Sequence, residues 1–139
     1  MRFMMIVKSD KNTESGAMPT QEELAAMGKY NEELVKAGVL LAGEGLHPSA
    51  KGARIQFNQR KPTVIDGPFA ESKELIAGFW IIQVKSREEA LEWARRVPFV
   101  DGELELRQVF DAADFAASDP TGELREAEER LRAQAASRN

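Results

Sequence analysis

A short segment in the middle of the chain gathers residues that could carry acid-base chemistry. Asp66 leads into Gly67-Pro68, Glu71 and Lys73 follow closely, and the apolar run 75–84 begins directly after them. A carboxylate beside a buried strand can act as a general base, because the strand fixes its position. Asp before Gly-Pro also shapes turns by accepting hydrogen bonds from the following backbone amides. Both roles, base and turn former, remain open for Asp66.

The chain has one histidine, His47, and a side chain that titrates near neutral pH suits a proton carrier. Glu44 lies three residues earlier, so the fold could bring both residues to Asp66 around one pocket. A surface or structural role for His47 is the alternative. One histidine with irregularly spaced carboxylates is a weak ligand set, and we therefore predict no metal site.

Four further residues are candidates for contacting a substrate. Arg107 carries a planar guanidinium that can hold a carboxylate through two hydrogen bonds, or it could pair with a glutamate across the sheet. Lys73 would favour an anionic substrate, although Glu71 and Lys73 could also form only a solvated ion pair. Trp80 could wall the pocket or lie in the core, where its indole N–H would need a partner.

Composition excludes several classes of function. The absence of Cys excludes disulfides, thiolate catalysis and iron-sulfur clusters. A net charge of -4 offers no basic face for nucleic acid, and no phosphate-binding loop or dinucleotide fingerprint is present, so we predict no cofactor. No apolar run approaches the about 20 residues of a membrane helix, and the apolar start is too short for a signal peptide. We expect a cytoplasmic protein without a membrane partner.

The hydrophobic pattern predicts four strands that alternate with two helices. We expect strands over 2–8, 39–46, 76–84 and 103–110. Thr20-Gln21-Glu22-Glu23 and Ser86-Arg87-Glu88-Glu89 have the spacing of capping boxes and begin the two helices. Between the second and third strands, alternation over 53–65 predicts a hairpin at the sheet edge with one solvated face.

Individual side chains are also assigned by this pattern. The first helix should bury one apolar stripe, which consists of Leu24, Met27, Tyr30, Leu34 and Val35. The last strand should direct three side chains to the core: Leu104, Leu106 and Phe110. The segment 111–120 is expected to be a linker, and 122–136 a charged helix that is a solvated appendage or a dimer clasp.

This order predicts an α+β fold, a ferredoxin-like βαββαβ unit with an inserted hairpin, in which both helices cover one face of an antiparallel sheet. The strand 76–84 is apolar on both faces, with Phe79 and Ile81 on one and Trp80 and Ile82 on the other. An uncovered apolar face of that size is unusual for a monomer, so we predict a homodimer. We place one domain at 1–115 and a polar linker with a C-terminal helix at 116–139.

Over residues 1–110 the chain resembles the YCII-related family, in particular the branch with an Asp-Gly-Pro-Phe (DGPF) motif. The matching segments are Glu44-Gly45-Leu46, Asp66-Gly67-Pro68-Phe69-Ala70-Glu71 with Lys73-Glu74, Gly78-Phe79, and Glu105-Leu106-Arg107. The branch has Val and Pro where this chain has Leu106 and Gln108. The resemblance implies a dimeric α/β-barrel with a polar pocket beside the sheet. It also implies either an enzyme of unsettled substrate or a companion of sigma factors.

Two functions are therefore carried forward. In the first, a cofactor-independent enzyme of isomerase or lyase type acts on a small anionic molecule, with Asp66 as base, His47 as proton donor and Arg107 or Lys73 as anion anchor. In the second, the same pocket belongs to a non-catalytic ligand-binding or regulatory module. Convergence of Asp66 and His47 on one cavity would favour the first.

Overall fold

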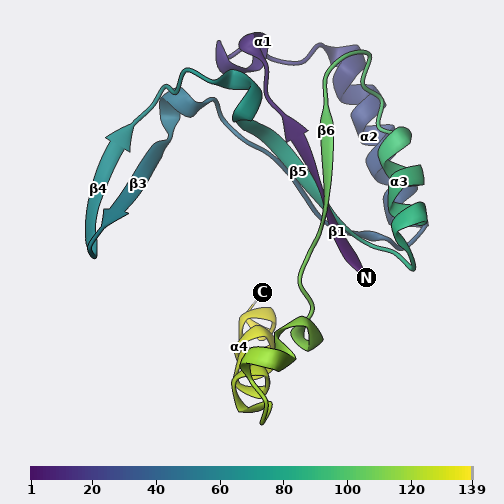
Figure 1. The fold of residues 1–139 in the computed structure, drawn as a ribbon. Helices are drawn as coiled ribbons and strands as arrows, with labels where there is room; N and C mark the ends of the chain where they lie inside the picture. Colours follow the sequence, from purple (N-terminus) through teal and green to yellow (C-terminus); the bar gives the residue numbers. More distant parts are fainter. Residues whose placement is uncertain (139) are drawn as a thin grey trace. The chain divides into compact units, whose positions relative to one another are not determined.

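The first part of the chain is built around a four-stranded antiparallel sheet. The computed structural model describes residues 1–138, and the chain divides into two compact units, Met1–Gln108 and Val109–Asn139. In the first unit the strand order is β2-β5-β1-β6, with β1 at Arg2–Lys8, β2 at Leu40–Gly45, β5 at Ile76–Gln83 and β6 at Leu104–Gln108 (Figure 1). Helices α2 (Gln21–Lys36) and α3 (Arg87–Arg95) cover one face of this sheet (Figure 1). The unit is α+β, and its arrangement is consistent with the ferredoxin-like expectation.

Both long helices of this unit begin where the sequence predicts. The Thr20 hydroxyl accepts a hydrogen bond from the Glu23 amide at 3.1 Å, and the Ser86 hydroxyl accepts one from the Glu89 amide at 3.1 Å. Each bond satisfies a backbone donor that has no partner within its helix. The N-cap bonds of the two predicted capping boxes are confirmed. The glutamates do not accept from the N-cap amides, since Glu23 accepts from the Thr20 hydroxyl and Glu89 from the Lys85 amide.

The core lies between the helices and the sheet. Buried side chains from both layers form one cluster: Phe3, Met5, Tyr30, Leu34, Val39, Trp80, Ile82, Val84, Ala90, Trp93 and Val97. The prediction that Leu24 and Val35 join it is wrong, since both are exposed. The buried stripe of α2 is narrower than predicted and consists of Tyr30 and Leu34 with the half-buried Met27.

The inserted hairpin does not extend the main sheet. Strands β3 (Ala53–Asn58) and β4 (Lys61–Asp66) pair only with each other, and all their residues are exposed. The expected position at the sheet edge is therefore wrong, although the hairpin itself is confirmed. Gln59 and Arg60 form its turn with φ of 48° and 69°, the conformation that matches the twist of paired strands. We call β3 and β4 the arm, which projects from the sheet in Figure 1.

Short elements occupy the segments between the strands. The segment expected to be a loop after β1 contains helix α1 (Lys11–Glu14), where the Asp10 carboxylate accepts from the Thr13 amide at 2.8 Å. Two single 3₁₀ turns follow, η1 (Ser49–Lys51) and η2 (Ser72–Glu74). In β2 the register shifts between Leu40 and Ala42, which is a bulge.

The second unit consists of two helical segments, η3 (Ala112–Ser118) and α4 (Glu123–Ser137). The prediction of Phe110 on the core side of the last strand is wrong, because β6 ends at Gln108 and Phe110 contacts Phe115 instead. Asp119 caps α4 and binds the Arg125 guanidinium at 3.0 Å. A folding boundary after residue 115 stays a prediction. None of the helices within residues 1–138 is long and apolar enough to span a membrane.

Candidate functional site

One face of the main sheet is not covered by α2 and α3, and we call it the open face. The strand registers align its side chains in two rows that cross all four strands: Glu44, Phe79, Ile6 and Glu105 in one, and Ala42, Ile81, Met4 and Arg107 in the other. The four side chains of β1 and β5 in these rows are apolar and only half-buried. The open face therefore has an apolar centre, and ionisable groups lie on its two edge strands.

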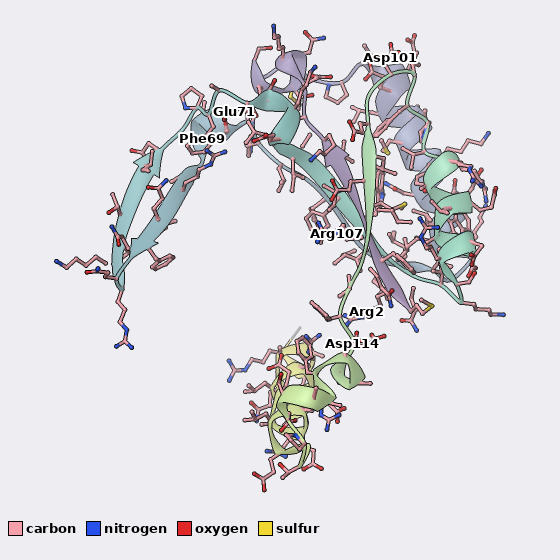
Figure 2. All side chains as sticks on the ribbon, in the orientation of Figure 1. Arg2, Phe69, Glu71, Asp101, Arg107 and Asp114 are labelled. Atoms are coloured by element: carbon pink, nitrogen blue, oxygen red, sulfur yellow. The ribbon has the colours of Figure 1, made fainter. Side chains whose placement is uncertain are left out.

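A chain of ion pairs runs along the β6 edge of the open face. The Glu105 carboxylate lies 3.7 Å from the Lys8 ammonium and 3.2 Å from the Arg107 guanidinium. Arg107 is the exposed end of this chain, and Figure 2 shows it on β6. On the opposite edge, Glu44 has neither an ion pair nor a side-chain hydrogen bond to any other residue in 1–138. The face thus offers the exposed Arg107 guanidinium on one edge strand and the Glu44 carboxylate on the other, with an apolar floor between them.

The segment 66–74 begins at the base of the arm. Asp66 pairs with Ala53 at the end of β4, and the Gly67 amide donates to the Gly52 carbonyl at 3.0 Å. A Cβ atom at position 67 would lie 1.9 Å from the Ser49 carbonyl oxygen, so only glycine fits there. The glycine of the motif is explained by this close approach of two backbone segments.

Ser49 ties three segments together beneath the motif. Its hydroxyl accepts from the Phe69 amide at 3.0 Å and donates to the Glu14 carboxylate, and its own amide donates to Glu14 at 3.0 Å. The Arg54 guanidinium lies 3.9 Å from the centre of the Phe69 ring, which is a cation–π contact. We call Glu14, Ser49, Arg54, Gly67 and Phe69 the arm clamp.

Sequence reasoning missed the roles of Glu14 and Ser49 in this clamp. They are 35 residues apart, and each stands in a polar segment without a distinctive motif. The clamp also means that Gly67 and Phe69 hold the base of the arm in place, which is a structural role. Figure 2 shows Phe69 and Glu71 at this base.

The predicted catalytic residues are exposed and separate. Asp66 and His47 both lie in or beside the loops at the end of the sheet, and no hydrogen bond or ion pair joins them in the described part of the chain. Glu71 and Lys73 are also exposed. Lys73 lines a shallow hollow of about 320 Å³ together with Asp10, Lys11, Asn12 and Ser72. Two exposed ammonium groups, those of Lys11 and Lys73, line this hollow.

Trp80 lies on the other side of the sheet from Glu44 and Arg107. It is buried under the helices, and its indole N–H donates to the Asn31 side-chain oxygen at 2.8 Å. A Cβ atom at Gly43 would lie 2.9 Å from the Trp80 ring, so the glycine makes room for the indole. Burial raises the pKa of the neighbouring Tyr30 to about 12, which is typical of a phenol in the core.

The predicted site residues therefore fall into three groups. Glu44 and Arg107 share the open face. His47, Asp66, Glu71 and Lys73 are exposed in the segments that join the sheet to the arm, with Asp66 at the end of β4 and Lys73 in η2. Trp80 lies in the core. Among residues 1–138 no three His, Asp or Glu side chains are placed to hold one metal ion.

Comparisons with known proteins relate this chain to one protein family. A family model described as YCII-related domain matches residues 1–113. An uncharacterized protein of Rhizobium meliloti (strain 1021) is 30% identical over 97 residues, which cover 68% of this chain and 78% of that protein. A solved structure of 5-chloro-2-hydroxyhydroquinone dehydrochlorinase from Burkholderia phenoliruptrix AC1100, in complex with 2,5-dihydroxybenzoquinone, aligns with a TM-score of 0.40 and 15% identity over 79% of this chain and 94% of that one. A likeness at that level carries no conclusion about this chain.

Proposed function

The chain belongs to the YCII-related family, and on that premise we propose that it binds a small anionic molecule on the open face of its sheet. We assign it to the DGPF branch of the family, on the motif 66–71, and to the cytoplasm. In this proposal the open faces of two copies turn toward each other as a dimeric α/β-barrel and enclose the ligand between them.

The apolar centre of the open face, flanked by ionisable groups, carries this proposal. Small-molecule sites combine an apolar lining with a few polar groups that orient the ligand. Phe79 and Ile81 supply such a lining, and Arg107 supplies a guanidinium whose fork matches a carboxylate. A half-buried apolar face of this kind loses its contact with water when a second copy and a ligand cover it.

We propose acid-base chemistry as the activity of this site. Glu44 or Asp66 would take a proton from a carbon next to the ligand's carbonyl group, and His47 would return a proton at another position. Such a transfer is an isomerisation, and loss of a leaving group instead would make it a lyase reaction. Glu71 and Lys73 would stand at the rim, and Trp80 would support the sheet from the core.

A screen of small carboxylic acids by thermal shift tests the proposal. We expect hits on the wild type whose dissociation constants rise at least tenfold in Arg107→Gln, because the lost charge-assisted bonds are worth about 1.5–3 kcal/mol. Arg95→Gln is the matched control, since Arg95 is an exposed, ion-paired arginine on α3. Equal affinity of every hit for Arg107→Gln and the wild type would contradict the proposal.

A non-catalytic ligand-binding or regulatory module is the second candidate function. A companion of a sigma factor would be one such regulatory module. The second candidate is favoured by one observation, that Asp66 and His47 form no hydrogen-bonded pair in residues 1–138. The two candidates differ in turnover. NMR spectra of a bound hit, recorded over time, distinguish the two. An enzyme converts the hit into a product, and the Asp66→Asn variant should not. A binding module leaves the hit unchanged.

A further inference from the structure

One face of the arm is apolar and exposed, except at its base, where Asp66 lies opposite Ala53. Register places Ile55 opposite Val64 and Phe57 opposite Pro62, and the side chains of each pair share that face. Ile55 is 51% exposed, Val64 64% and Phe57 75%. Two-stranded hairpins are at best marginally stable in water, so an apolar face of this kind needs a partner. We call Ala53, Ile55, Phe57, Pro62 and Val64 the apolar face of the arm.

The opposite face of the arm is held by the arm clamp. Arg54, on that opposite face, contacts the ring of Phe69, and Gly67 is bonded to Gly52 at the base. The base of the arm is thus fixed to the body before any partner binds. A segment that is already ordered loses less conformational entropy on binding, which favours its use as a docking element.

Charge indicates what kind of partner the arm prefers. Residues 53–66, which form the arm, hold three basic residues, Arg54, Arg60 and Lys61, and one acidic residue, Asp66, a net charge of +2. Since the whole chain has a net charge of -4, the remainder carries -6. A second copy of the same chain therefore attracts the arm, and it also presents an open apolar face of its own.

We propose that the apolar face of each arm packs over the open face of a second copy and forms one wall of that copy's ligand site. We call this the arm exchange. It is reciprocal, because one two-fold axis relates the two copies and each arm covers the sheet of the other copy. This inference rests on the proposed function, because the wall completes the same site. The site of one chain is then incomplete without residues from its partner.

The absence of natural Cys permits a direct test by cross-linking. One preparation carries Phe57→Cys, and a second, distinguished by a larger tag, carries Ala42→Cys or Arg107→Cys. These two positions end one row of the open face, so they sample both of its edges. After mixing and treatment with a short bismaleimide, we expect a cross-linked heterodimer with at least one of them. Arg95→Cys on α3 is the matched control and should not cross-link.

A substitution in the arm provides a second, independent measurement. Phe57→Ser removes an exposed side chain and should leave the folded chain intact, while it weakens the dimer at least tenfold in sedimentation equilibrium. Val100→Ser is the matched control, because Val100 is 97% exposed and lies outside both surfaces. An unchanged dimer dissociation constant in Phe57→Ser, together with no cross-link to either open-face position, would overturn the inference.

The outcomes separate this inference from the proposed function. Cross-linking from arm to open face without any carboxylate hit would support the exchange and contradict the ligand site. Carboxylate binding that depends on Arg107 and persists unchanged in Phe57→Ser, without cross-linking, would support the ligand site and overturn the exchange. A chain that remains monomeric at micromolar concentration would overturn the exchange as well.

Discussion

The carbonyl oxygen of Ser49 occupies the space that a side chain at Gly67 would need. The two residues meet where the turn before β3 passes under the base of β4, and a Cβ atom at position 67 would be 1.9 Å from that oxygen. Two backbone segments in such contact cannot separate without moving the arm. The contact makes the arm and the turn η1 one rigid structure, on which the proposed exchange depends.

Gly67→Ala should lower the stability of the first unit and loosen the arm. The added methyl group forces the two segments apart, and overpacking of this kind costs about 1–3 kcal/mol. Gly52→Ala is the control, because its Cβ atom would lie 3.5 Å from the same oxygen, an ordinary contact. Chemical denaturation measures both variants, and equal loss of stability in the two would contradict the assignment.

Ser49→Ala should release the Phe69 amide. The substitution removes the hydroxyl that accepts from this amide at 3.0 Å and that donates to Glu14. Leaving part-buried polar groups without partners costs about 1–3 kcal/mol. Hydrogen exchange at the Phe69 amide is expected to accelerate, whereas Ser15→Ala, which alters an exposed serine, should leave it unchanged. Unaltered exchange in Ser49→Ala would show that the clamp does not hold this segment.

Asn31→Ala should destabilise the core without affecting ligand binding. The Trp80 indole N–H loses its acceptor at 2.8 Å and stays buried, at a cost of about 1–3 kcal/mol. Trp80 fluorescence and thermal denaturation report the core, and the affinity for carboxylate hits reports the open face. A large loss of affinity in a variant that remains folded would place Trp80 in the site after all.

Acid should weaken the start of α4 through Asp119. Although burial alone would raise the pKa of this carboxyl, hydrogen bonds from Arg125 and Leu124 hold the pKa below its ordinary value of 3.8. Because the pKa is lower in the folded chain, ionised Asp119 stabilises the folded form at pH values above the ordinary pKa. This stabilisation is lost as the pH falls through the pKa of the folded form. The protection of the Leu124 amide, which is its exchange rate relative to the intrinsic rate at the same pH, should fall below about pH 4, and Asp119→Ala should show low protection at every pH. Glu128→Gln is the control.

Local signals in the sequence predicted much of this fold. The caps at Thr20 and Ser86 depend on contacts three residues apart, and both are present as expected. The apolar run 76–84 predicted a strand, and β5 is present at Ile76–Gln83, between β2 and β1. These features follow from short-range geometry and periodicity, which a single sequence contains.

The features that were missed depend on contacts between distant segments. Alternation in 53–65 predicts the hairpin but not whether it joins the main sheet, because pairing partners are not encoded in periodicity. Phe110 continues the alternation of β6, yet the strand ends two residues earlier. Glu14 and Ser49 acquire their roles only when the chain folds and brings them together.

The role of the candidate site residues stays a prediction, and only the shared face of two of them follows from the strand pattern. Glu44 and Arg107 share the open face because both follow the alternation of their strands. The positions of Asp66 and His47 depend on the course of loops, which the sequence does not specify. Their joint role stays a prediction.

Mapping a bound carboxylate by NMR tests the central claim most directly. When a hit from the screen is added to the labelled protein, we predict that the largest shifts occur at the amides of Ile6, Phe79, Ile81 and Arg107, on the open face. Shifts confined to the helices α2 and α3, or to the hollow around Lys73, would contradict the claim that the open face of the sheet is the ligand site.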